Sequence, residues 1–125
     1  MVRFHPIPFY FTVAGTSIQG QLSNALTSVA RIAEIYMIFP AGTQLNLLYQ
    51  FFLLGARPAS LTVLPGSGEL TQKEVTTGPF VGDAISYSSP CQYALLEAAP
   101  YLAMFATNNN ASTLSSQAVA IVEDL

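Results

Sequence analysis

The chain has 125 residues, of which 51% are hydrophobic and 9% are charged, and its net charge is −3. This length fits a single domain, while globular domains usually carry about 25% charged residues. So few basic residues exclude the cationic surface that nucleic-acid binding requires. A chain this apolar and this poor in charge is expected to cover part of its surface with other chains.

The start of the chain lacks the pattern of a secretory signal, because residues 1–15 contain two prolines and no uninterrupted apolar region. We therefore expect synthesis in the cytoplasm. The strongest apolar segment, residues 45–55, is interrupted by Asn46 and Gln50 and is too short to cross a bilayer. No membrane partner is expected.

The first segment has the pattern of a strand. Within residues 7–13 every second residue is apolar, which places these side chains on one face of a sheet. Pro6 and Pro8 cannot donate to a ladder, so this strand is expected at an edge, with residues 14–21 as the following turn. We expect residues 1–14 to form an extended arm and edge strand, and residues 15–125 a single β-sandwich domain.

Residues 20–39 fit either a helix or strands. The end of this stretch, IYMIF at residues 35–39, is β-branched and aromatic and stops at Pro40, which favours two strands with a bend at residues 28–31. The helical alternative has helices at 22–37, 44–54 and 90–99, where alanine and leucine are abundant.

The rest of the chain continues the strand pattern. Residues 45–53 have an apolar side chain at every odd position, as expected for one buried face of a strand. Residues 59–70 predict a short strand that ends in a turn rich in Gly and Pro. Residues 71–90 are polar and predict a long loop with one short strand. Further strands are expected at 91–98, 100–107 and 115–123, the last two joined by a polar hairpin tip. About eight short strands with turns every 8 to 12 residues predict an all-β, antiparallel β-sandwich or jelly roll.

No cluster of residues predicts a reaction. The chain has one histidine, His5, and one cysteine, Cys91, which excludes an internal disulfide and sites built from several cysteines or histidines. We interpret Cys91 as a small core or interface residue. The carboxylates Glu69, Glu74 and Glu123 are scattered and interpreted as solvated surface groups. We predict a protein that is not an enzyme, with no catalytic, metal-binding or cofactor-binding residues.

Residues 99–124, APYLAMFATNNNASTLSSQAVAIVED, contain an aromatic-led strand, a turn of Asn, Ala, Ser and Thr, and a last alternating strand. This segment resembles the closing hairpin of small β-sandwich or jelly-roll proteins from tailed bacteriophage particles, which include capsid decoration (cement) proteins. The sequon at Asn110, by contrast, is interpreted as part of an exposed hairpin tip, since no secretory signal accompanies it.

The resemblance implies a homotrimer on the outside of a virion capsid that binds the major capsid protein and stabilises its lattice. The low charge agrees with docking through strand edges and apolar contacts. The proline-rich start is a candidate arm, whose free edge is expected to add to a neighbouring sheet. The candidate interface residues are Phe4, Pro6, Ile7, Pro8, Phe9, Phe11, Asn108, Asn109 and Asn110.

Other functions remain open on the sequence. A phage fibre or tail tip, or a carbohydrate-binding β-sandwich module, would bind host glycan with an aromatic face. A cellular oligomeric scaffold fits the composition equally well. A cupin-like enzyme subunit would need metal-binding histidines, which a chain with one histidine lacks.

Overall fold

The computed structural model describes residues 3–26, 30–66, 70, 79–95 and 101–124, and of residues 91–95 it describes the backbone. The predictions for Glu69, Glu74 and the Cys91 side chain therefore lie outside the described residues. In the described part of the chain, no helix is long and apolar enough to span a membrane.

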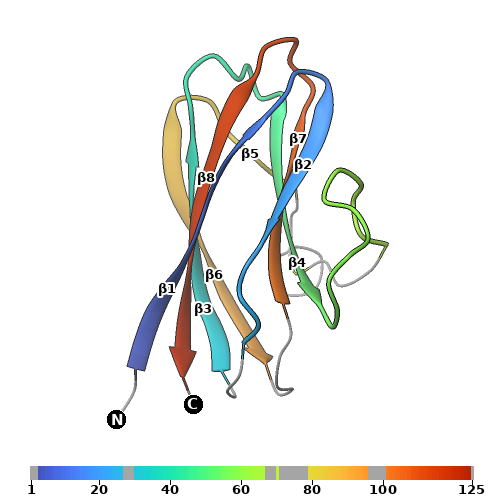
Figure 1. The fold of residues 1–125 in the computed structure, drawn as a ribbon. Helices are drawn as coiled ribbons and strands as arrows, with labels where there is room; N and C mark the ends of the chain where they lie inside the picture. Colours follow the sequence, from blue (N-terminus) through green and yellow to red (C-terminus); the bar gives the residue numbers. More distant parts are fainter. Residues whose placement is uncertain (1–2, 27–29, 67–69, 71–78, 96–100, 125) are drawn as a thin grey trace.

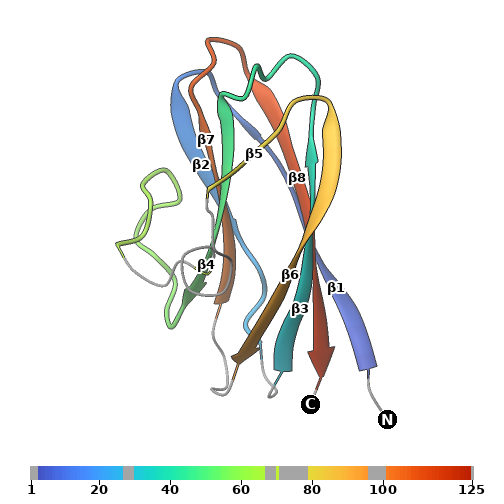
Figure 2. The ribbon, with the colours of Figure 1, turned by 180° about the vertical axis from the view of Figure 1, so that it is seen from behind.

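The described residues form eight strands in two antiparallel, four-stranded sheets that face each other (Figures 1 and 2). The β1 sheet has the order β1-β8-β3-β6 and the β2 sheet the order β2-β7-β4-β5. The strands are β1 (Arg3–Val13), β2 (Ser17–Leu22), β3 (Ala30–Phe39), β4 (Leu47–Leu54), β5 (Phe80–Val81), β6 (Ile85–Leu95), β7 (Tyr101–Asn108) and β8 (Leu114–Asp124).

The strands pair from the outside of the sequence inward. β1 pairs with β8, β2 with β7, β3 with β6 and β4 with β5, so that the chain is arranged as one long hairpin rolled into two layers. This is the topology of a jelly roll, and it confirms the predicted all-β sandwich. The helical alternative is wrong for residues 30–39 and 47–54, which are strands paired with distant segments.

The core lies between the sheets because alternate side chains of each strand point inward. Phe9 of β1, Ile35 of β3 and Phe51 of β4 are each at most 1% exposed. The rings of Phe39 and Tyr49 stack across the layers with centroids 4.1 Å apart. The predicted edge position of the first strand is confirmed, since β1 is the outermost strand of its sheet.

Residues 17–21, predicted to lie in a turn, belong to β2 instead. The correction has a local reason at Gly20, where the ring of Phe105 lies against the backbone: a Cβ at this position would be 2.5 Å from the ring. This glycine weakened the strand signal in the sequence, but in the structure it makes room for the ring, and β2 pairs with β7 over its whole length.

Residues 59–66, predicted as a short strand, form no strand. They instead cover the outer face of the β2 sheet, where Leu61 and Leu64 pack with Phe52 and Phe105 in a second small cluster. The amide of Gly20 donates a hydrogen bond to the Leu61 carbonyl at 2.7 Å, which fastens this segment to the sheet. The apolar residues of this segment thus pack onto the face of a sheet and do not form a strand.

Residues 85–90, predicted to lie in a long loop with one short strand, belong to the long strand β6, which continues through Leu95. Pro90 suggested a strand end, yet β6 is an edge strand, and an edge tolerates proline where the missing N–H faces away from the neighbouring strand. The ladder of β3 with β6 also changes register between Ile32 and Glu34, next to the partner of Pro90.

The prediction that the last two strands pair as a hairpin is also wrong. β7 and β8 lie in different sheets, so residues 109–113 form an arch across the sandwich. The connections at 14–16, 40–46 and 82–84 also cross between the sheets and lie with this arch at the end opposite the two termini (Figure 1). We call this the arch end.

Candidate functional site

The outer surface of the β1 sheet is rich in apolar side chains and is not covered by any described segment. We call it the open face and define it by the apolar outward side chains of β1, β3 and β8: Phe4, Pro6, Pro8, Tyr10, Tyr36, Ile38, Val119 and Ile121. The register places Pro6 opposite Ile121 and Pro8 opposite Val119, with Tyr36 on the far side of Val119. The row of Pro8, Val119 and Tyr36 is therefore apolar across three strands, while Gln117 lies between Tyr10 and Ile38 and Glu34 lies beside Ile121.

The exposure of this surface is large for apolar side chains. Phe4 is 60% exposed, Tyr10 63% and Tyr36 45%. The outer surface of the β2 sheet differs, because Phe52 and Phe105 there are at most 2% exposed beneath the segment that contains Leu61. Described residues thus cover the outer surface of the β2 sheet and leave that of the β1 sheet exposed.

The few charges beside the open face are paired or hydrogen-bonded. Nη2 of Arg31 is 2.6 Å from Oε2 of Glu123. The hydroxyl of Tyr36 donates to Oε2 of Glu34 at 3.0 Å, and this bond, together with the negative charge of Glu34, raises the pKa of Tyr36. Tyr36 therefore stays neutral at ordinary pH, and the ionised groups that lie among the residues of the open face, Arg31, Glu34 and Glu123, each have a hydrogen-bond partner.

The residues of β1 that were predicted for the interface lie on both faces of this strand. Phe4, Pro6 and Pro8 point outward onto the open face. Phe9 is 1% exposed and belongs to the core, against which Ile7 and Phe11 also pack. The two-residue period of a strand is the reason, since consecutive side chains point to opposite faces. The two-residue period alone could have identified Phe4, Pro6, Pro8 and Tyr10 as the outward residues from the sequence.

The three predicted asparagines lie at the arch end, away from the centre of the open face. The side chain of Asn108 is fully buried. Its Nδ2 donates to the carbonyls of Val13 at 3.2 Å, Ala14 at 3.2 Å and Ser112 at 2.8 Å, and its Oδ1 accepts from the amide of Asn110 at 2.9 Å. Asn108 therefore satisfies backbone groups of two arches and is not available to a partner in this conformation.

The neighbouring asparagines extend this network to a third arch. Asn110 donates from Nδ2 to the carbonyl of Gly42 at 3.1 Å, and the amide of Asn109 donates to the carbonyl of Asn46 at 2.9 Å. The side chain of Asn109 is exposed. Polar uncharged residues are suited to this place because arches leave backbone groups without ladder partners.

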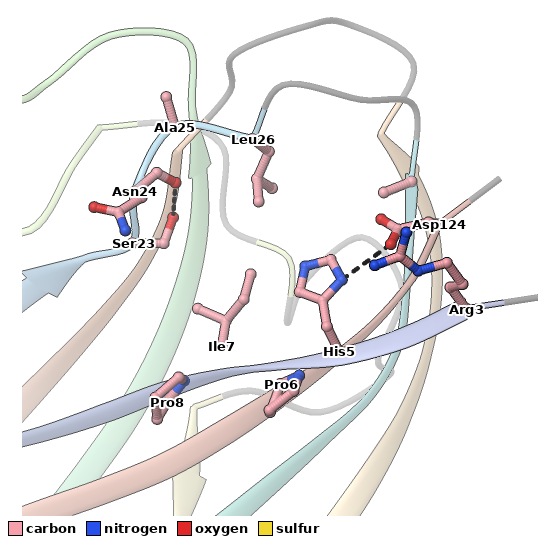
Figure 3. A pocket seen from close by; sticks show the side chains of 11 residues that line it. Arg3, His5, Pro6, Ile7, Pro8, Ser23, Asn24, Ala25, Leu26 and Asp124 are labelled. Atoms are coloured by element: carbon pink, nitrogen blue, oxygen red, sulfur yellow. Dashed lines mark hydrogen bonds and ion pairs between the residues drawn. The ribbon is translucent and has the colours of Figure 1, made fainter.

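A cavity of about 440 Å³ lies at the end that holds both termini, between β1 and the residues after β2 (Figure 3). Nδ1 of His5 and Oδ2 of Asp124 face each other across 3.2 Å at its rim. The hydroxyl of Ser23 also lines the cavity, but it donates to the carbonyl of Asn24 and accepts from the amide of Leu102. This serine is thus engaged by backbone groups and does not form a relay with His5.

Metal ligands do not gather in the part of the chain that the structure describes: no three His, Cys, Asp or Glu side chains come together there. His5 and Asp124 form a pair without a third such residue. The open face is therefore the surface of the described structure with the most distinct chemical character.

A scan of protein-family models and a search of curated proteins found no match to the chain. Solved structures with a similar fold include a chain of infectious bursal disease virus, Gt strain, with 11% identity and a TM-score of 0.55 over 98% of this chain and 32% of that one. A chain in the capsid asymmetric unit of cyanophage Pam1 has 17% identity and a TM-score of 0.51, over 99% and 84%. PliG of Aeromonas hydrophila, a periplasmic inhibitor of g-type lysozyme, has 15% identity and a TM-score of 0.50, over 94% and 86%.

The chain thus spans about a third of the length of the infectious bursal disease virus chain (32%) and most of the other two (84% and 86%). At these identities the likeness shows the fold, a jelly roll of the kind found in viral capsids. The same fold occurs in the lysozyme inhibitor, so the fold alone does not select a function.

Proposed function

We propose that the protein is a virion structural protein that decorates the outside of a capsid, binding the major capsid protein as a homotrimer and stabilising the lattice without catalysis. The observation that carries this proposal is the open face, an exposed and largely apolar surface of three strands that no described segment covers. Monomeric proteins rarely leave a patch of this kind uncovered, and such patches mark interaction sites.

The physical character of the open face suits binding to a preformed shell. Its side chains project from a three-strand ladder, and Pro6 and Pro8 further restrict the backbone of β1. A surface that is ordered before binding loses little conformational entropy on binding. The exposed rings of Tyr10 and Tyr36 are the residue type that most often contributes binding energy at the centre of interfaces.

The fold supports the same proposal. The chain in the Pam1 capsid asymmetric unit has a similar length and a similar fold. Binding sites on a capsid repeat around symmetry axes, and a homotrimer would present three copies of the open face to such a site. The protein would then lie on the capsid exterior after synthesis in the host cytoplasm.

The experiment mixes the purified protein with capsids of the encoding virus that were assembled without it, and measures bound protein after sedimentation. We expect saturable binding by the wild type, and a loss of at least about tenfold in affinity for Tyr10→Lys, because a charge on the apolar surface must be desolvated on binding. Val63→Lys is the matched control, since Val63 is 64% exposed and Tyr10 63%, and Val63 lies outside the open face.

Two outcomes would contradict the proposal. No binding of the wild type to such capsids would exclude a decoration function, and equal losses for both lysine variants would exclude the open face as the contact. The mass in solution is a separate measurement of the assembly: a trimer has three times the 13.4 kDa of one chain.

A second candidate function is binding of host glycan, as a fibre or tail tip or as a carbohydrate-binding module. The observation that favours it is the exposure of three rings, those of Phe4, Tyr10 and Tyr36, on one sheet face. A glycan array probed with the wild type and with Tyr36→Ala tests it. Glycan binding that the variant loses, together with no capsid binding, would select this function over decoration.

A further inference from the structure

We propose that the free edge of β6 is a second contact of the protein, at which an extended segment of the capsid subunit adds as a further strand to the β1 sheet. This inference rests on the proposed decoration function and names how the capsid subunit would be held. It follows from the directions of the backbone groups at the two edges of that sheet.

The free edge of β1 offers few hydrogen-bond donors. The amide of Tyr10 donates to Oε1 of Gln21 at 2.9 Å and not to β8, so the even-numbered residues of β1 direct their backbone groups away from β8. Pro6 and Pro8 have the same direction and no N–H. An incoming strand would therefore meet an edge without free donors at residues 6, 8 and 10, because two are prolines and the amide of Tyr10 is bonded to Gln21, so the predicted addition of the β1 arm to a neighbouring sheet is disfavoured.

The opposite edge of the sheet has different chemistry. In each strand the backbone N–H and C=O groups of successive residues point alternately to the two sides. Followed through the cross-strand pairs from β1 to β8, β3 and β6, this alternation directs the backbone groups of Ile85, Tyr87 and Ser89 toward β3. The bond from the amide of Gln117 to the Tyr49 hydroxyl, on the β3 side of β8, agrees with this alternation. Ser86, Ser88 and Pro90 therefore direct their backbone groups outward.

This outward side of β6 is an edge that a strand can extend. In the described part of the chain no strand lies beyond β6 (Figure 2). Ser86 and Ser88 each supply an N–H and a carbonyl, and Pro90 supplies a carbonyl. Regularly spaced donors and acceptors of this kind are the complement of an extended backbone.

A shallow cavity of about 420 Å³ lies beside the same edge, between β5 and β6. Its walls include Phe80, Val81 and Tyr87, and none of the described residues that line it is charged. Alternate side chains of an added strand would point into this cavity. The occupant is therefore an extended, uncharged segment with apolar residues at every second position.

A second copy of the chain is the other conceivable occupant, paired through its own β6. Pairing of two identical edges generates a two-fold axis and closes as a dimer. This symmetry does not build the proposed three-fold assembly. Pairing of β6 with another edge of a second copy is disfavoured because the β1 edge offers few donors, the Gly20 amide of β2 is bonded to Leu61 and β5 has two residues, so the segment is assigned to the capsid subunit.

The test uses Ser88→Pro, which removes one outward N–H. Proline is already present at the outward position Pro90, and the variant reproduces in β6 the spacing of Pro6 and Pro8 in β1. We therefore expect the variant to fold. Ser88→Thr is the control, because it changes the side chain and keeps the amide. In the sedimentation experiment with capsids, we expect at least about tenfold weaker binding for Ser88→Pro and near wild-type binding for Ser88→Thr.

A measurement on the unmodified protein accompanies the variants. Hydrogen exchange of the peptide that contains Ser86 and Ser88 should slow when the wild type is bound to capsids. Binding of wild type and Ser88→Pro with equal affinity, or unchanged exchange in this peptide, would overturn the inference while the decoration function stands. A wild-type dimer that Ser88→Pro converts to a monomer would assign the edge to a second copy and overturn it as well. Failure of the wild type to bind would overturn the decoration function itself, and this inference with it.

Discussion

The hydroxyl of Tyr49 accepts a hydrogen bond from the amide of Gln117 at 3.2 Å, across the interface between the two sheets. The same hydroxyl donates to the carbonyl of Ile38 at 2.7 Å. Ile38 and Gln117 are cross-strand partners at the end of the β3–β8 ladder, so a side chain of the β2 sheet joins two strands of the β1 sheet. Tyr49 is fully buried, and its burial raises the pKa of the hydroxyl.

Tyr49→Phe is expected to destabilise the protein by about 1–3 kcal/mol, because the amide of Gln117 and the carbonyl of Ile38 lose a partner in the core. Urea unfolding at neutral pH measures this difference. Tyr10→Phe is the control, since the exposed Tyr10 hydroxyl lies on the open face, and its loss should change stability by less than about 0.5 kcal/mol. Equal stabilities of the two variants would contradict a bridging role of the Tyr49 hydroxyl.

The protein is expected to lose stability in alkaline solution. Burial raises the pKa of Tyr49 and of Tyr87 above the value of 10.0 in an unfolded chain, so folding favours the neutral hydroxyls. The stability from this preference is complete below about pH 10 and is lost as the pH rises through the folded-state pKa values. Unfolding in urea at a series of alkaline pH values measures the decline.

Tyr49→Phe tests the assignment of this decline. The variant starts from a lower stability at neutral pH, but its free energy of unfolding should fall less steeply above about pH 10, because one buried group no longer ionises. Parallel curves for wild type and variant would show that Tyr49 does not contribute to the alkaline loss.

Asn108→Asp is expected to destabilise the protein more than Asn108→Ala. Both changes leave the carbonyls of Val13, Ala14 and Ser112 without their donor, at a cost of roughly 2 kcal/mol or more. The aspartate also places a buried carboxylate beside these carbonyls. Thermal unfolding compares the two variants with Asn109→Asp, whose side chain is exposed and which should stay near the wild type. A small effect of Asn108→Asp would exclude its role in joining the arches.

Gly20→Ala is expected to destabilise the protein by about 1–3 kcal/mol, since the new Cβ would be 2.5 Å from the ring of Phe105. Gly66→Ala is the control, because no atom lies within 4 Å of a Cβ built there. Chemical denaturation measures both.

A second change tests the cause of the Gly20 effect. Phe105→Leu removes the ring, so Gly20→Ala should cost less in that background than in the wild type. An unchanged cost would show that the contact with the ring is not its cause.

Local pattern was sufficient for the parts of the fold that depend on neighbouring residues. The alternation of residues 7–13 predicted an inward apolar set, and Phe9 and Val13 are each 1% exposed. Pro6 and Pro8 predicted an edge strand because the missing N–H groups exclude a central position. The same alternation identifies Phe4, Pro6 and Pro8 as outward, since a strand has two faces.

Local pattern failed where the partner of a segment is distant. The apolar segments on either side of the asparagines were predicted to pair as a hairpin, but β7 pairs with β2 and β4 while β8 pairs with β1 and β3. Residues 59–66 have the composition of a strand and instead cover Phe105. In both cases the apolar side chains of a segment can be buried against several different partners, and the fold of the whole chain decides which partner it has.

The amino-acid sequence by itself determined that the protein is built of strands, that its surface is poor in charge and that its aromatic residues fall on alternating faces. These properties follow from side-chain chemistry and the two-residue period of the extended backbone. The tertiary structure alone decided which sheet each strand joins, that described residues cover the β2 sheet but not the open face, and that the edge of β6 offers more free donors than the edge of β1. Coverage and edge direction depend on the register between strands far apart in the chain, and register is a property of the assembled sheets.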